Sequence, residues 1–170
     1  IIKNVSIPSS AVSDYGPTVG IIGVLGGTVK NLGVENITIT GGAVDRLCMG
    51  GIAGSLMEDA QITDCYVKGM NVTSTASTPY AGGIAGRTIG SVGTMENCYT
   101  KNINFSLANQ NVSAGILGSC GNTGYSAVNC YTTHSKIQGY ASATNSNMGV
   151  TNCYVNVTPE IHPEATMLGE

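Results

Sequence analysis

Apolar and polar residues alternate along short stretches of this chain. Val5 and Ile7 share one face of such a stretch, and Ile37 and Ile39 repeat the arrangement 32 residues later. A period of two predicts β-strands, whereas a helix would repeat its apolar positions every three to four residues. The pattern therefore predicts short strands that are separated by bends.

These stretches belong to a repeat of about 32 residues, which two short signatures mark. A Gly-Ile-x-Gly signature recurs at offsets of 31, 32 and 32 residues, and an Asn/Asp-Cys-Tyr signature follows it. The glycine signature lies at 20–23, 51–54, 83–86 and 115–118, and the cysteine signature lies at 64–67, 97–100, 129–132 and 152–155. In the first copy Leu32 and Gly33 stand where Cys and Tyr are expected. Two signatures in a common register indicate a true internal repeat.

A corner is predicted in each copy where the alternation slips by one residue. The residues at this position are Asn4, Asn36, Gly69, Asn102 and, as a weaker match, His134. Asn and Gly tolerate the left-handed backbone conformation that a sharp bend requires. Each copy has too few apolar residues to fold alone, but stacking on its neighbours would bury them.

We therefore expect an all-β fold, a right-handed parallel β-helix (β-solenoid) with about 32 residues per coil and roughly five coils. A β-sandwich is the alternative, although it does not require equivalent residues every 32 positions. Residues 1–158 form the expected solenoid domain, and 159–170 form a cap or linker. The chain starts part-way through a repeat, so we expect a fragment of a longer protein. Further repeats or domains of the same chain should cover the exposed ends of the stack.

Four of the six cysteines occupy one position of the repeat and should form an inward-facing column. They are Cys65, Cys98, Cys130 and Cys153. In a parallel stack their Cβ atoms would lie about 4.8 Å apart, which favours buried free thiols over disulfides, the alternative state. A linear column cannot surround a zinc ion tetrahedrally, so we expect no metal.

The tyrosines that follow these cysteines should point outward as a ladder. Such a row either stacks on sugars or shields the sheet by ring-on-ring stacking. Three connections, 73–81, 106–113 and 139–147, should leave the coils on one side. Their Ser, Thr, Asn and Tyr content is typical of recognition loops, and equally of inert ones. The candidate binding residues are Tyr66, Tyr99, Tyr131, Tyr154, Tyr80 and Tyr140.

Charged residues make up only 10% of the chain, and the net charge is −3. This composition disfavours nucleic-acid binding, which depends on basic surfaces. The only local charge clusters are Asp45-Arg46 and Glu58-Asp59, which solvated turns explain. Many polysaccharide lyases and hydrolases are parallel β-helices, but their chemistry needs acid and base groups clustered on one face. We expect no catalytic residues, no cofactor and no membrane span.

The two signatures together resemble the GLUG repeat of bacterial surface and secreted proteins, which also occurs in non-catalytic regions of IgA-cleaving metallopeptidases. The matching stretches are 50–54 with 64–67, 82–86 with 97–100, and 114–118 with 129–132. The resemblance implies a β-solenoid segment of a large exported protein, often adhesive. It carries no protease activity over, because His162-Pro163-Glu164 is not the HExxH zinc motif.

We therefore expect a non-catalytic, adhesin-like or stalk-like module that is extracellular or at the bacterial cell surface. Its possible partners are a host or cell-surface glycan or protein. The alternative is a carbohydrate-binding β-helix associated with a glycan-active enzyme.

Overall fold

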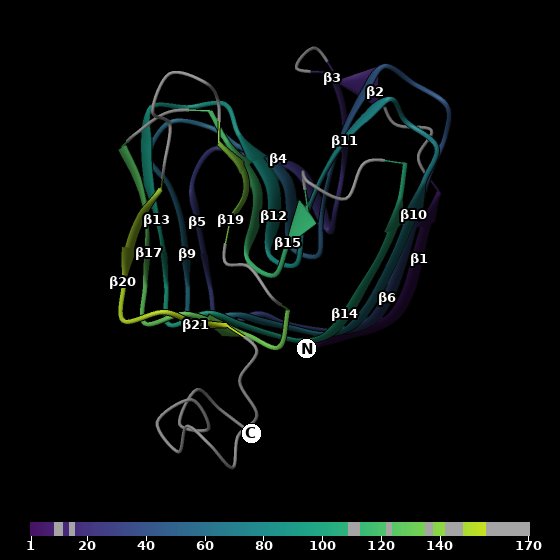
Figure 1. Ribbon diagram of the computed structural model, residues 1–170. Helices are drawn as coiled ribbons and strands as arrows, with labels where there is room; N and C mark the ends of the chain where they lie inside the picture. Colours follow the sequence, from purple (N-terminus) through teal and green to yellow (C-terminus); the bar gives the residue numbers. More distant parts are fainter. Residues whose placement is uncertain are drawn as a thin grey trace.

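The alternating stretches form strands that stack from one turn of the chain to the next in a computed structural model (Figure 1). The structure describes residues 1–8, 12–13, 16–108, 113–121, 124–134, 138–141 and 148–155 of the 170. Within these ranges all regular structure is strand, and no helix is long and apolar enough to cross a membrane. The expected cap or linker at 159–170 lies outside the described residues.

Four sheets run along the stack, and we name them by their place in it. The long sheet contains β1 (Ile2–Pro8), β6 (Gly33–Gly41), β10 (Tyr66–Ser74), β14 (Tyr99–Leu107), β18 (Tyr131–Thr132) and β21 (Tyr154–Val155). The first inner sheet contains β2 (Val12–Ser13), β3 (Gly16–Val19), β7 (Arg46–Gly50), β11 (Thr78–Gly82) and β15 (Ser113–Ala114). The second inner sheet contains β4 (Ile22–Leu25), β8 (Ala53–Leu56), β12 (Ala85–Thr88), β16 (Leu117–Cys120) and β19 (Gln138–Ala141). The side sheet contains β5 (Thr28–Lys30), β9 (Ala60–Thr63), β13 (Val92–Glu96), β17 (Gly124–Val128) and β20 (Gly149–Thr151).

Equivalent residues of successive repeats lie side by side in these sheets, which confirms the predicted parallel β-helix. Tyr66 pairs with Tyr99, Tyr99 with Tyr131, and Tyr131 with Tyr154, all in parallel strands. The chain turns in a right-handed sense from its N-terminus to its C-terminus (Figure 1). About four turns are formed, slightly fewer than the five expected. The last turn is short because the chain passes from β18 to β19, which pairs with β16 of the second inner sheet.

The two inner sheets fold into the middle of each turn as a V, with the glycine signature at its tip (Figure 1). The arms of the V touch through glycine. A Cβ on Gly54 would stand 2.5 Å from the backbone nitrogen of Val19, and a Cβ on Gly86 would stand 2.5 Å from that of Met49. Such separations are below any that a real side chain tolerates, so only glycine allows the two backbones to approach this closely.

The tip of the V rests on the long sheet. A Cβ on Gly51 would lie 2.8 Å from a methyl group of Val67, and one on Gly83 would lie 2.8 Å from the methyl group of Thr100. The apolar residues of all four sheets then pack into one connected core, which includes fully buried Ile37, Ile62 and Met95. Each buried aliphatic side chain of this size contributes about 1.5–3 kcal/mol.

Two rows of corners carry left-handed backbone conformations. The predicted row is confirmed, because Asn4, Asn36, Gly69 and Asn102 have φ values of 56°, 55°, 67° and 55°. His134 is not among the positive-φ residues. A second row precedes the cysteine column, at Asn31, Asp64, Asn97, Asn129 and Asn152, with φ between 50° and 55°. The alternation of apolar residues did not predict this second row, yet β9 ends at Thr63 and β10 begins at Tyr66, so that Asp64 lies between the two strands.

Side-chain amides bond each corner to the next along the stack. Asn97 Nδ2 donates to Asp64 Oδ1 at 2.9 Å, and Asn129 Nδ2 donates to Asn97 Oδ1 at 3.2 Å. Asn36 Nδ2 donates to Asn4 Oδ1 at 3.1 Å in the other row. Asn therefore serves twice, by adopting the left-handed conformation and by joining neighbouring turns.

The glycine contacts give a stability prediction. Gly86→Ala should lower the free energy of unfolding by about 1–3 kcal/mol, because its methyl group overpacks the contact with Met49. The matched control is Gly27→Ala, since a Cβ at Gly27 meets nothing within 4 Å and should change stability by less than about 1 kcal/mol. Urea unfolding of the two variants measures the difference, and equal midpoints would contradict the predicted role of Gly86.

Candidate functional site

The predicted tyrosine ladder is formed on the outer face of the long sheet. The ring centroids of Tyr66 and Tyr99 are 5.0 Å apart, and those of Tyr99 and Tyr131 are 4.9 Å apart, with interplanar angles of 11° and 2°. Tyr154 packs against the same cluster, which is separate from the main core. Ring-on-ring stacking is therefore confirmed, and it leaves Tyr99 only 2% exposed. Sugar binding by the remaining ring edges stays a prediction.

Gly33 explains why the first repeat departs from the Cys-Tyr signature. Tyr66 is in register with Gly33, and a Cβ there would collide with the ring of Tyr66. The missing side chain thus gives Tyr66 a flat backbone surface to lie on, and both ring faces of Tyr66 are covered. Tyr66 is the first ring of the ladder, and because it lies against Gly33 it leaves no ring face exposed at this end.

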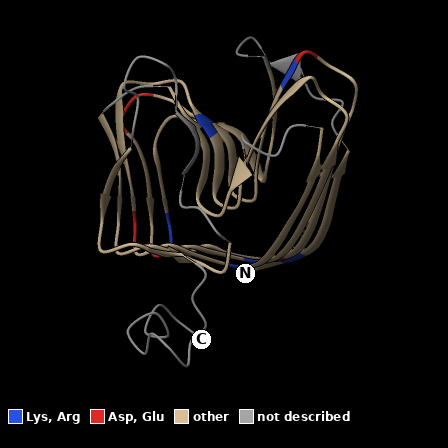
Figure 2. Cartoon of the chain, in the orientation of Figure 1, with Lys and Arg blue, Asp and Glu red and all other residues tan. Residues whose placement is uncertain are grey.

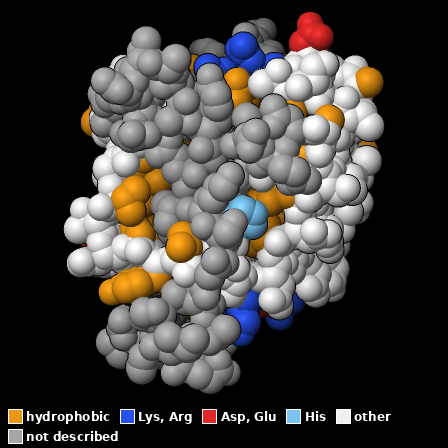
Figure 3. Space-filling model, viewed as in Figure 1, with side chains coloured by type: hydrophobic (Ala, Val, Ile, Leu, Met, Phe, Trp, Pro, Cys, Tyr) orange, Lys and Arg blue, Asp and Glu red, His pale blue; other side chains and the backbone are white. Residues whose placement is uncertain are grey.

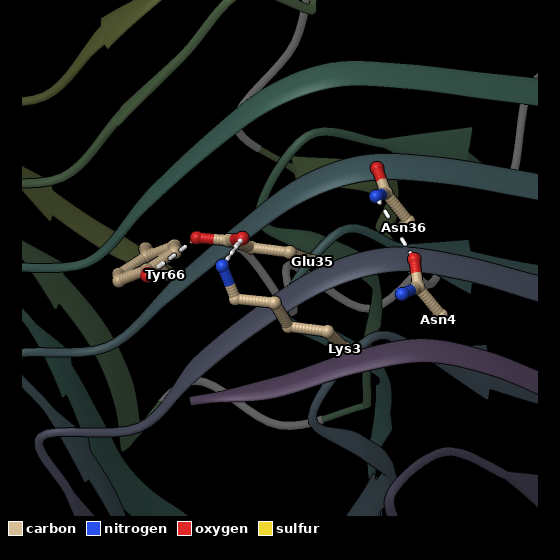
Figure 4. A network of polar contacts seen from close by, with 5 residues as sticks. All are labelled: Lys3, Asn4, Glu35, Asn36 and Tyr66. Atoms are coloured by element: carbon tan, nitrogen blue, oxygen red, sulfur yellow. Dashed lines mark hydrogen bonds and ion pairs between the residues drawn. The ribbon is translucent and has the colours of Figure 1, made fainter.

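A column of charged residues flanks the ladder on the same face (Figure 4). Lys3 Nζ lies 2.7 Å from Glu35 Oε2, and the Tyr66 hydroxyl donates to Glu35 Oε1 at 2.9 Å. The hydrogen bond from Lys3, with that from Tyr66, lowers the pKa of Glu35. Burial, with the hydrogen bond to Glu35, raises the pKa of Tyr66. The Lys68 ammonium lies 5.1 Å from the Tyr66 ring centroid and 5.4 Å from that of Tyr99, which adds cation–π contacts.

The predicted cysteine column lies inside the corners, and its thiols are free. Each sulfur lies close to the carbonyl oxygen two residues earlier, for example 3.1 Å for Cys65 to Thr63 and 3.2 Å for Cys98 to Glu96. The same contact recurs at 3.3 Å for both Cys130 and Cys153. A thiol is a weak donor, so these contacts help to satisfy carbonyls at the bend. The column is thus a structural part of the corner, and no three His, Cys, Asp or Glu residues in the described ranges are grouped to hold a metal.

A groove of about 450 Å³ opens where β6, β10 and β14 end. It is lined by Thr40, Gly41, Thr73, Ser74, Thr75, Ser106, Leu107 and Ala108. The lining includes the first residues of two connections, 73–81 and 106–113, that the sequence analysis identified as a possible binding face. These residues are Thr73 to Thr75 and Ser106 to Ala108. The lining offers hydroxyl groups from three successive turns and two apolar side chains, Leu107 and Ala108, and it includes no charged residue.

The other two candidate tyrosines lie away from the ladder. Tyr80 belongs to the first inner sheet, where it packs on Cys48, and the Arg87 guanidinium lies 5.4 Å over its ring. Tyr140 belongs to β19 of the second inner sheet, and its side chain lies outside the described part of the structure. Sequence reasoning therefore missed the position of Tyr80 beside Arg87, because it did not predict the V that brings the two inner sheets together.

Comparison with known families agrees with the repeat geometry. Residues 45–73, from the first inner sheet through the cysteine corner to the long sheet, match the family model described as the GLUG motif. The chain carries a GLUG repeat. No curated protein and no solved structure gave a match. The GLUG motif here is the structural unit of a solenoid: its glycines let the inner sheets touch, and its Asp-Cys-Tyr segment makes the corner and the ladder.

Thiol accessibility tests the cysteine column. Iodoacetamide in native buffer should modify Cys153 alone, since Cys48, Cys65, Cys98, Cys120 and Cys130 are buried. The modification should be slow at neutral pH, because the hydrogen bond with Cys130 and burial raise the pKa of Cys153. Hydrogen bonding with the Cys130 and Cys65 thiols, together with burial, also raises the pKa of Cys98, so that little reactive thiolate forms there.

Mass spectrometry locates the modified residues. After denaturation all six thiols should react. Rapid native alkylation of Cys98, or an absence of reactive thiols after denaturation, would contradict a column of buried free thiols.

Proposed function

We propose that this chain is a non-catalytic interaction module, adhesin-like or stalk-like, of an exported bacterial surface protein. The observation that supports it best is the uncharged groove shared by three successive turns, on a stack that holds its lining strands in register. Side chains from β6, β10 and β14 face one ligand together, as in binding surfaces built on repeats. The groove binds a host or cell-surface glycan or protein through hydrogen bonds from its hydroxyl groups and apolar contact with the Leu107 side chain.

The polar exterior of the long sheet also supports a role outside the cell. Ser6, Thr38, Asn71 and Asn104 form one exposed row across four strands, in register with one another. Such a face is well hydrated without charge, and it suits a stalk that holds a binding surface away from the cell.

Surface exposure is the first test of this proposal. Antibodies raised against the folded chain should label intact cells that produce the parent protein, and protease treatment of intact cells should remove the signal. Antibodies against a cytosolic protein of the same cells provide the control. Labelling that requires permeabilisation would contradict an exported surface protein.

The alternative function is a carbohydrate-binding β-helix that is associated with a glycan-active enzyme and binds sugars through the tyrosine ladder. A glycan array distinguishes sugar binding in the groove from sugar binding on the ladder. Thr73→Arg should block the groove, and Thr28→Arg is the matched control because Thr28 is an exposed residue of the side sheet. Tyr66→Ala removes the ring that stacks on Tyr99 and so disrupts the ladder.

We expect glycan binding to be lost in Thr73→Arg and kept in the other two variants. Loss in Tyr66→Ala alone would favour the alternative. Absence of binding to every glycan would reject both sugar-binding functions and leave a protein partner for the groove.

A further inference from the structure

The two arginines of the chain lie in the two inner sheets of neighbouring turns. Arg46 begins β7, and Arg87 is in β12. Figure 2 shows the corresponding blue segments on the two arms of the V, and Figure 3 shows basic side chains at the top of the same view, with an acidic side chain near them and further basic side chains at the bottom. The chain has five lysines besides, and its net charge is −3.

Strand register and ring contacts arrange this cluster. Thr78 is in register with Arg46, and Tyr80 is in register with Cys48. Arg87, in register with Ser55, extends to the first inner sheet, where its guanidinium lies 5.4 Å from the ring centroid of Tyr80. Tyr80 is 8% exposed and held against Cys48, so it restrains the plane of the Arg87 guanidinium.

Neither arginine forms an ion pair in the described part of the chain, although Asp45 precedes Arg46 in sequence. The thiol between them stays neutral, because burial raises the pKa of Cys48. Arg46 is exposed and Arg87 is half-buried, so both remain accessible to a ligand.

We propose that Arg46 and Arg87 form a site for the carboxylate groups of an acidic polysaccharide. A guanidinium binds a carboxylate through two parallel hydrogen bonds, and a restrained guanidinium loses less conformational entropy on binding. The surroundings favour a sugar chain, because Thr78, in register with Arg46, offers a hydroxyl group that can pair with sugar hydroxyls while the arginines bind carboxylates.

This site rests on the proposed interaction function and adds a ligand class to it. The groove is lined by other residues and carries no charge, although the short connections that follow β6 and β10 lead from it to Arg46 and Thr78. The two surfaces therefore predict different ligand chemistry, and different substitutions should remove each.

The test uses polygalacturonate as the probe, with its methyl ester as the uncharged matched ligand and polyglutamate as the acidic peptide. Isothermal titration calorimetry compares the unaltered chain with Arg46→Gln, Arg87→Gln and the double variant. Lys101→Gln is the matched control, since it removes one positive charge from the long sheet. Circular dichroism shows whether each variant is folded.

Polygalacturonate should bind, and each arginine substitution should weaken binding about tenfold, the equivalent of about 1.4 kcal/mol. Lys101→Gln should leave the affinity unchanged, the methyl ester should not bind, and added salt should weaken binding. Arg87→Lys, which keeps the charge but loses the planar fork, should bind less tightly than the unaltered chain.

The proposal fails if polygalacturonate does not bind, if the double variant binds it as tightly as the unaltered chain, or if polyglutamate binds more tightly than polygalacturonate. The interaction function is judged separately. A chain that keeps its groove-dependent glycan or protein binding after both arginines are replaced retains that function and loses the arginine site.

Discussion

The close approach of the two inner sheets is the contact on which the rest of each turn depends. Two backbones meet at Gly54 and Gly86 with no side chain between them, and the tip of the V then reaches the long sheet at Val67 and Thr100. With a larger residue at these positions, the V would open and its tip would leave the long sheet. The apolar residues of the inner sheets would lose their partners. The glycine signature therefore has a packing role, which explains why it recurs once per turn.

In-register stacking also accounts for the scarcity of charge. A parallel solenoid places the same repeat position of successive turns about 4.8 Å apart, where two like charges repel by about 1 kcal/mol even in water and by more at a partly buried site. Uncharged side chains that bond to copies of themselves avoid this cost, as Asn97 and Asn129 do. In the one column of the long sheet that carries several charges, Glu35 lies between Lys3 and Lys68, and only the next pair, Lys68 and Lys101, places like charges in register. Arg46 and Arg87 lie in different columns, in register with the uncharged Thr78 and Ser55.

The sequence predicted the features that depend on the residue pattern within a single strand or corner. Inward Cys65, outward Tyr66 and the left-handed corner at Asn36 all follow from periodicity and from residue types that act locally. The corner at Asp64 was missed because the alternation of apolar residues continues through it, so the pattern alone resembles a straight strand. Leu32 and Gly33 looked like a degenerate repeat until the structure showed the ring of Tyr66 lying over Gly33.

The V was beyond prediction from one sequence, and the arrangements that depend on it were also missed. Glycines at 50–54 indicate a turn, but no local pattern shows that the strands on either side fold inward and touch. The contact of Arg87 with Tyr80, across two sheets, follows from that fold. The groove was anticipated only in part: two of the connections that form it were identified, whereas Thr40 and Gly41, its lining residues on β6, were not.

The most direct test of this account is a nuclear Overhauser measurement between the α-protons of Gly86 and the backbone amide proton of Met49. The two residues are 37 positions apart in the sequence, and they meet only if the inner sheets touch through glycine. The account predicts a strong cross-peak for this pair, and a second one between Gly54 and the amide proton of Val19. Complete assignments with no cross-peak at either pair would contradict it.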